Sequence, residues 1–262
     1  MAINTPSGTW TLDKVAFYAT STKAIRNGQC AHTYALEHPV SMANGAAACD
    51  LAFAEVTPLV LGASYLSGLS VTANQSLPYS DATIMQPSNH WPRERSMGDG
   101  NAVVATTVEF QTVLEAFVTA WPFAGQHEKV LLMIHHWLDS LACWSFEDFY
   151  LSATTLLQII AATEESIEGK DLYYFDAVTS AAKRAGIHAL KRDFKDMRNN
   201  LIHEGKLLGG RFSGQSLQDC AAVAADVLNW FDAYLHSVLG LGAVRRQRFS
   251  FQNFLSLNTY SL

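Results

Sequence analysis

The second half of the chain is a succession of helix-length apolar segments, and this pattern constrains the fold more than any other feature. Each segment is rich in Leu, Ala and aromatic residues, and Gly169, Gly186 and Gly240 follow three of them. Because glycine commonly stands just after the end of a helix, these residues predict where the helices stop. We expect helices at residues 104–120, 128–144, 146–165, 172–184, 187–203 and 217–239, packed up and down as a bundle.

Residues 1–100 have a different pattern. Residues 8–20 are rich in aromatic, Thr and Val residues, which favours one or two strands. Residues 43–66 are typical of a buried helix, apolar around most of the circumference, with Pro58 as a kink or break. Residues 68–100 collect Pro, Ser, Asn and Asp, as in a surface loop at a domain boundary. The sequence therefore predicts a smaller mixed α/β region that packs on the bundle as a recognition or regulatory layer.

The last segment, residues 241–262, changes character again. A basic cluster at 245–248 precedes a stretch in which Phe and Leu alternate in places with Ser and Gln. The alternation favours a strand added to the N-terminal region, or packing on a partner, over a basic-aromatic contact with RNA. The expected fold class is mainly α, in three parts: the mixed α/β region 1–100, the helical bundle 101–240 and this tail.

Composition excludes several classes of protein. Apolar residues make up 49% of the chain and charged residues 16%, which is typical of an ordered globular protein. The apolar runs at 59–71 and 130–134 are short or interrupted, so we expect no membrane span, and no secretory signal opens the chain. The four cysteines form no CxxC pair, and His135-His136 suits a polar helix edge better than a metal site. We expect free thiols, no metal and a cytoplasmic location.

The residues best suited to catalysis lie in the segment DFKDMRNNLIHEG, residues 193–205. Arg198 is a permanent cation, Asn199 is a neutral hydrogen-bonding group, and His203 is a proton-transfer group. Cleavage of a phosphodiester without a metal requires these three properties. An Arg and a His at this spacing also arise by chance, so the context matters: the segment continues an apolar stripe of helical period, and Gly205 follows as a helix stop.

The string RNNLIHEG, which follows a long apolar helix and a core helix, resembles the Arg-Asn-x-x-x-His signature of HEPN domains. It is most similar to the bacterial branch related to abortive-infection proteins, over residues 101–240. The resemblance implies a helical bundle that acts as a metal-independent endoribonuclease, without a cofactor, in phage defence or a toxin system. It implies an active site formed across a homodimer, with Arg198, Asn199 and His203 as catalytic residues.

Other HEPN domains have lost catalysis and serve as nucleotide-binding or protein-interaction modules. A non-catalytic module, with a regulatory protein as a partner, is therefore the alternative function. If the chain is a ribonuclease, His203 should be open to solvent, whereas a structural histidine would be packed.

Charge distribution favours RNA as the partner. The chain carries a net charge of −6, but between Lys183 and Arg211 eight Lys and Arg residues outnumber three Asp and Glu residues. A basic segment that coincides with the motif is typical of a localised site for an RNA backbone, although solvated helices also show such faces. The residues expected to bind RNA are Lys191, Arg192, Lys195 and Lys206.

The spacing of the motif leaves its geometry open. Residues 198 and 203 lie about 140° apart around an ideal helix, so their side chains do not share a stripe. The helix distorts near Gly205, or Arg198 reaches round it, or a second subunit completes the site. A purely structural interpretation also stays open, in which His203 meets the helix dipole and Arg198 binds a carboxylate.

Overall fold

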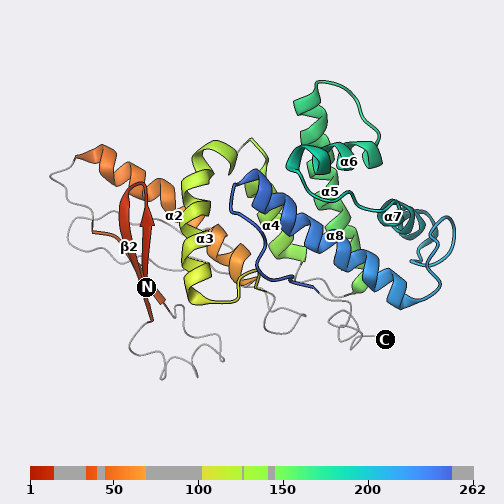
Figure 1. Cartoon of the computed structure of the whole chain (residues 1–262), viewed down its shortest axis with the longest axis horizontal. Coiled ribbons are helices and arrows are strands. Elements are labelled where there is room, and N and C mark those ends of the chain that lie inside the picture. Colours follow the sequence, from red (N-terminus) through yellow and green to blue (C-terminus); the bar gives the residue numbers. More distant parts are fainter. Residues whose placement is uncertain (15–33, 40–44, 69–101, 126, 141–144, 250–262) are drawn as a thin grey trace.

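The computed structural model of the chain describes residues 1–14, 34–39, 45–68, 102–125, 127–140 and 145–249. The fold is mainly helical, as predicted, with a small antiparallel sheet at one end (Figure 1). The strands are β1 (Ala2–Thr5), β2 (Gly8–Lys14) and β3 (Tyr34–Glu37). The described helices are α2 (Ala46–Ser67), α3 (Thr107–Ala120), the π-helical turn η2 (Trp121–Gly125), α4 (Val130–Ser140), α5 (Phe146–Glu168), α6 (Tyr174–Ala185), α7 (Asp193–Glu204) and α8 (Leu217–Val238).

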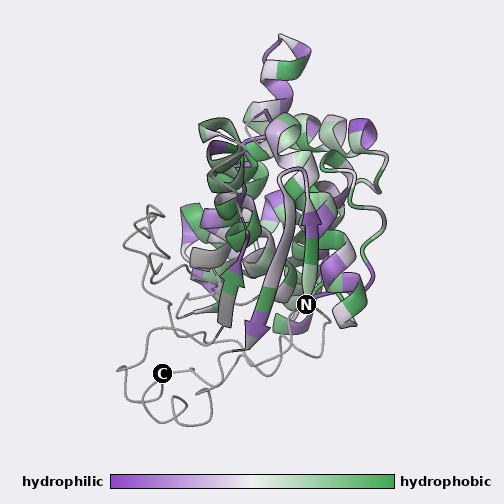
Figure 2. Cartoon of the chain, turned by 90° about the vertical axis from the view of Figure 1, so that its left-hand side faces the viewer, coloured by the Kyte–Doolittle hydropathy of each residue, from purple (hydrophilic) through white to green (hydrophobic). Residues whose placement is uncertain are grey.

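The sheet has the order β1-β2-β3, and both pairs are antiparallel. Ile3 of β1 is paired with Trp10 of β2, and both side chains are buried. Figure 2 views this end of the molecule, where the strands lie in front of the helices. The strand predicted from residue 8 is confirmed as far as Lys14. The rest of that prediction, the loop at 69–100 and the tail beyond Phe249 lie outside the described residues.

A buried carboxylate attaches the sheet to the helices. Glu55 of α2 accepts hydrogen bonds from the Thr5 hydroxyl (2.5 Å), the backbone N–H and hydroxyl of Ser7, and the indole N–H of Trp10 (2.9 Å). A buried carboxylate is costly unless its oxygens accept several hydrogen bonds, and here four donors converge on it. The turn between β1 and β2 is therefore tied to α2 by side-chain chemistry as well as by apolar packing.

Helix α2 runs through Pro58 without a break, so of the kink or break predicted at this residue the break is wrong. Farther along, Gly62 allows α2 to approach α3 closely, because a Cβ atom there would lie 2.7 Å from Cδ1 of Leu114. The expectation that no segment is long and apolar enough to span a membrane is also wrong, since α2 meets that criterion with 22 residues and a mean hydropathy of 1.5. The core helix of a soluble protein meets the same criterion, but only 33% of the segment of α2 that meets it is buried. Its buried residues pack on α3 and α4, and it carries the bonded Glu55.

Local sequence signals explain most helix boundaries. Thr106 and Ser216 accept hydrogen bonds from the backbone at the starts of α3 and α8, and each forms a capping box. Gly169 and Gly186 adopt left-handed conformations just after α5 and α6, as predicted. Pro122 does not stop the helix at once: the backbone continues from α3 into η2 before it turns towards α4.

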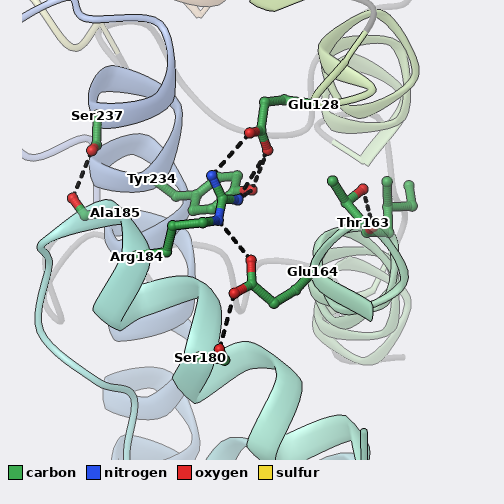
Figure 3. Close-up of polar contacts among 9 residues, drawn as sticks. Glu128, Thr163, Glu164, Ser180, Arg184, Ala185, Tyr234 and Ser237 are labelled. Carbon is green, nitrogen blue, oxygen red and sulfur yellow. Dashed lines mark hydrogen bonds and ion pairs between the residues drawn. The ribbon is translucent and has the colours of Figure 1, made fainter. Parts of the chain in front are cut away.

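An ionic cluster joins four helical segments at one end of the bundle (Figure 3). Arg184 of α6 donates to Glu128, just before α4 (3.0 and 3.2 Å), and to Glu164 of α5 (2.7 Å). The hydroxyl of Tyr234 on α8 donates to Glu128 at 2.7 Å, and that of Ser180 donates to Glu164 at 2.9 Å. The two carboxylates are buried, so the cluster fixes how these helices meet.

The described part of the tail packs into the core of its own chain. Arg248 is only 1% exposed; its guanidinium donates to the carboxylate of Asp232 on α8 and to the carbonyl of Tyr65 on α2. Phe249 is buried beside it, and residues 239–249 form no strand. The described part of the tail, which ends at Phe249, therefore does not form the added strand that the sequence predicted. Because Arg248 is buried, it is not a surface contact for RNA.

Candidate functional site

The motif lies on α7, which is shorter than predicted. The predicted helix 187–203 begins only at Asp193, and residues 187–191 form a connection outside any helix or strand. The indole N–H of Trp230 on α8 donates to the carbonyl of His188 at 2.8 Å, so this carbonyl binds a side chain of α8. Lys191 precedes α7, and Arg192 occupies the N-cap position without a side-chain capping bond.

The apolar side of α7 is buried against the bundle. Phe194, Met197 and Leu201 are buried, and the Tyr150 hydroxyl of α5 donates to the carbonyl of Phe194 at 2.6 Å. The helix ends at Glu204, and Gly205 adopts the left-handed conformation that the sequence predicts. Since α7 remains a regular α-helix through the motif, the option of a distorted helix near Gly205 is excluded.

The opposite side of α7 faces solvent and carries all three residues of the motif. At about 100° per residue, the order around this face is Arg198, Ile202, Lys195, Asn199 and His203. Ile202 and His203 are exposed, while the other three are partly buried. Arg198 and His203 therefore lie at the two edges of one exposed face. Between them lie the exposed Ile202, the cation Lys195 and the amide Asn199. We call this set of five residues the α7 face.

Arg198 is held by neutral groups. Its guanidinium carbon lies 5.3 Å from the centre of the Tyr174 ring, and its Nη1 lies 3.5 Å from the Oδ1 of Asn199. Among the described residues, no carboxylate lies within ion-pair distance of it. The structural interpretation in which Arg198 binds a carboxylate therefore finds no partner in the described chain. Its charge remains available for an anion.

His203 lies in the last turn of α7, and its side chain is exposed. Neither a hydrogen bond nor an ion pair joins its ring to another described residue. The positive charge of a protonated histidine is also favourable at this end of the helix. The ring is thus open to solvent, as a proton-transfer group must be, and it makes no contact with Arg198 within the described chain.

The four residues predicted to bind RNA do not all lie on the α7 face. Lys195 belongs to the α7 face, whereas Lys191 and Lys206 lie before and after the helix. Lys206 forms an exposed ion pair with Glu204 (2.9 Å), and such pairs are weak. Arg192 lies 3.8 Å from the carboxylate of Asp196, which is buried. No ion pair within the described chain engages Lys191 or Lys195. The positive charge near the motif is therefore only partly neutralised.

Two residues that sequence reasoning missed support the site. Asn200, next to the predicted Asn199, is buried, and its side-chain amide donates to the carbonyl of Gly209. This bond attaches the loop after α7 to the helix. In the sequence, the Gly209-Gly210 pair was the pattern that could have indicated this loop. The second is Tyr174, whose ring lies under Arg198 although it is 24 positions away in sequence. No local pattern pointed to it.

Two buried titratable side chains near the site, Tyr174 and Cys220, stay neutral. Burial raises the pKa of Tyr174 well above its ordinary value, although the nearby Arg198 opposes the shift, so its phenol stays protonated at neutral pH. Burial also raises the pKa of the Cys220 thiol to about 11, which excludes a thiolate nucleophile there. Cys220 is a free thiol, as predicted.

No cluster of three or more His, Cys, Asp or Glu side chains suited to a metal ion occurs in the described residues. His136, from the second histidine pair, is instead engaged with the Ser152 carbonyl and hydroxyl, both at 3.1 Å. Comparison with family models, curated proteins and solved structures finds no match to this chain.

Proposed function

We propose that this protein is a metal-independent endoribonuclease of HEPN type. It cleaves RNA by attack of a ribose 2′-hydroxyl on the adjacent phosphate and leaves a 2′,3′-cyclic phosphate end. One observation supports this proposal above the others: the α7 face combines an exposed histidine with an arginine that has neutral neighbours and no described carboxylate partner.

Each residue of the motif has a distinct role in this reaction. His203 removes the proton of the 2′-hydroxyl as a general base or protonates the leaving 5′-oxygen as a general acid. Arg198 stabilises the negative charge that develops on the phosphate. Asn199 lies beside Arg198 and orients it or the phosphate. Lys191, Arg192, Lys195 and Lys206 bind the flanking phosphates.

A homodimer provides the geometry that one chain lacks. Arg198 and His203 are separated around a regular helix, so a two-fold axis across two α7 faces brings Arg198 of one subunit near His203 of the other. Ile202, which is 48% exposed and lies next to Arg198 on this face, supplies an apolar contact near that axis. We place the interface on the α7 face and not along α8, because the apolar side of α8 is buried in its own chain.

The proposed setting is the cytoplasm, in phage defence or a toxin system. An acidic protein does not bind RNA indiscriminately, so the basic residues around α7 confine the substrate to one face. In this setting a regulatory partner restrains the enzyme until infection or stress.

The deciding experiment incubates total RNA with the wild-type protein and two variants, with and without EDTA. His203→Ala should abolish cleavage, and wild-type cleavage should persist in EDTA and yield cyclic phosphate ends. His188→Ala is the matched control, because His188 is also exposed and lies just before α7, but outside the α7 face. Cleavage that survives in His203→Ala, or that requires magnesium, would contradict the proposal. Binding of RNA or nucleotides without any cleavage would favour the non-catalytic alternative.

A further inference from the structure

The ring beneath Arg198 is held rigidly. Tyr174 is the first residue of α6, and its hydroxyl donates to the carbonyl of Thr154 on α5 at 3.0 Å. Phe194 of α7 packs edge-on to the same ring, with 5.6 Å between centroids and an interplanar angle of 77°. The phenol is therefore fixed at its tip and on its flank, and three helices determine where its ring lies.

A guanidinium that lies against such a ring has few orientations available. A guanidinium over an aromatic face is attracted by the ring quadrupole, and the interaction is stronger when it is partly desolvated. Its five N–H groups lie in one plane, in a fork that matches two oxygens of a phosphate. In Arg198 only Nη1 has a described acceptor, Asn199 at 3.5 Å, so most of these donors remain for a ligand.

We infer that Tyr174 is the positioning residue for Arg198: its ring holds the guanidinium so that its free N–H groups bind one phosphodiester through two oxygens. This inference rests on the proposed function, for which it specifies how the anion is held. Tyr174 does not touch the substrate and transfers no proton. Its contribution is to reduce the number of orientations that Arg198 must give up when RNA binds.

The next residue provides a natural control. Phe175 lies 5.9 Å below the guanidinium carbon of Arg192 and stacks on the same Phe194 ring, at 5.9 Å between centroids. Phe175→Leu thus removes an aromatic ring that, like Tyr174, belongs to α6 and packs on Phe194. It leaves Arg198 over the Tyr174 ring. A loss specific to Tyr174 cannot then be attributed to a general loosening of α6.

The first test is structural and requires no activity. The Nε–H resonance of Arg198, identified by its loss in Arg198→Lys, should lie upfield in an NMR spectrum because the ring current of Tyr174 shields it. Tyr174→Phe should keep this shift, Tyr174→Leu should abolish it, and Phe175→Leu should leave it unchanged. A shift that is absent in the wild type, or that persists in Tyr174→Leu, would overturn the inference.

The second test measures cleavage of a short RNA by the same variants. Tyr174→Leu should lower kcat/KM about tenfold, while Tyr174→Phe should restore it to within about threefold of the wild type. Phe175→Leu should lower kcat/KM clearly less than Tyr174→Leu, because its ring lies under Arg192, which binds only a flanking phosphate. Equal losses in Tyr174→Phe and Tyr174→Leu, or an equal loss in Phe175→Leu, would overturn the positioning role. If the wild type does not cleave RNA, the proposed function fails, and the NMR result still decides whether Tyr174 holds Arg198.

Discussion

The guanidinium of Arg248 is buried against the carboxylate of Asp232, with 3.0 Å between Nε and Oδ2 and both side chains almost completely shielded from solvent. Arg248 also donates to the carbonyl of Tyr65, and its guanidinium lies 5.1 Å from the Tyr65 ring centre. One side chain from the tail therefore connects α8, in the bundle, with α2, beside the sheet.

Removing one partner of this pair should be strongly destabilising. Asp232→Ala removes the described carboxylate partner of the buried Arg248 charge, and we expect the free energy of unfolding to fall by about 3–5 kcal/mol. Urea denaturation followed by circular dichroism measures this change. Asp226→Ala is the control, because Asp226 lies on the same helix in an exposed pair with His188 and should cost less than about 1 kcal/mol. Similar losses in the two variants would contradict the prediction.

The separation of Arg198 and His203 predicts complementation between inactive subunits. Arg198→Ala and His203→Ala should each be inactive alone. In a heterodimer of the two variants, one of the two composite sites contains an intact Arg198 and an intact His203. Random exchange of subunits makes about half of the dimers heterodimers, so the mixture should recover about a quarter of wild-type activity. Cleavage of a fluorescent RNA after mixing measures it, and a mixture that stays inactive would contradict a site shared between subunits.

The attachment of the sheet should depend on pH through Glu55. Burial by itself raises the pKa of Glu55, but hydrogen bonds from Ser7, Thr5 and Trp10 outweigh it, and the pKa lies below its ordinary value of 4.5. Because the folded-state pKa is the lower one, the carboxylate stabilises the fold at pH values above 4.5. This stabilisation is lost as the pH falls through the folded-state pKa.

Glu55→Gln should therefore reduce the free energy of unfolding by about 1–2 kcal/mol at pH 7, and the difference from the wild type should shrink below pH 4.5. Urea denaturation at several pH values measures the difference. Glu115→Gln is the control, because Glu115 also links a helix to β1, through the exposed Asn4. It should have little effect at any pH. A deficit in Glu55→Gln that is constant with pH would show that the charge is not responsible.

The loop after the motif helix should not tolerate a side chain at Gly210. This residue has a φ of 58°, and a Cβ atom there would lie 2.9 Å from the Cγ of Asn200. Gly210→Ala should cost about 2 kcal/mol, and Gly169→Ala, at a similar φ of 66° with nothing within 4 Å, should cost about 1 kcal/mol. Thermal denaturation compares the two. Adding Asn200→Ala to Gly210→Ala should cost less than the sum of the single changes, and strict additivity would exclude the clash.

Part of this architecture follows from local sequence. The glycines at 169, 186 and 205 end their helices, because a left-handed residue is favourable only without a Cβ atom. The apolar period correctly placed Phe194, Met197 and Leu201 in the core. Sequence reasoning missed the late start of α7; in the connection before it, the carbonyl of His188 accepts a hydrogen bond from Trp230, 42 positions away in sequence.

The features of the candidate site also fall into two groups, those that follow from local sequence and those that depend on the tertiary structure. The sequence by itself determined that an arginine, an amide and a histidine occupy the last turns of one helix, because helix period and the Gly205 stop are properties of neighbouring residues. Only the tertiary structure decided that Arg198 lies on Tyr174 and that Arg248 is buried in an ion pair. The reason is physical: whether a charge faces solvent, a ring or a counter-ion depends on contacts between distant segments, and those contacts form when the helices pack.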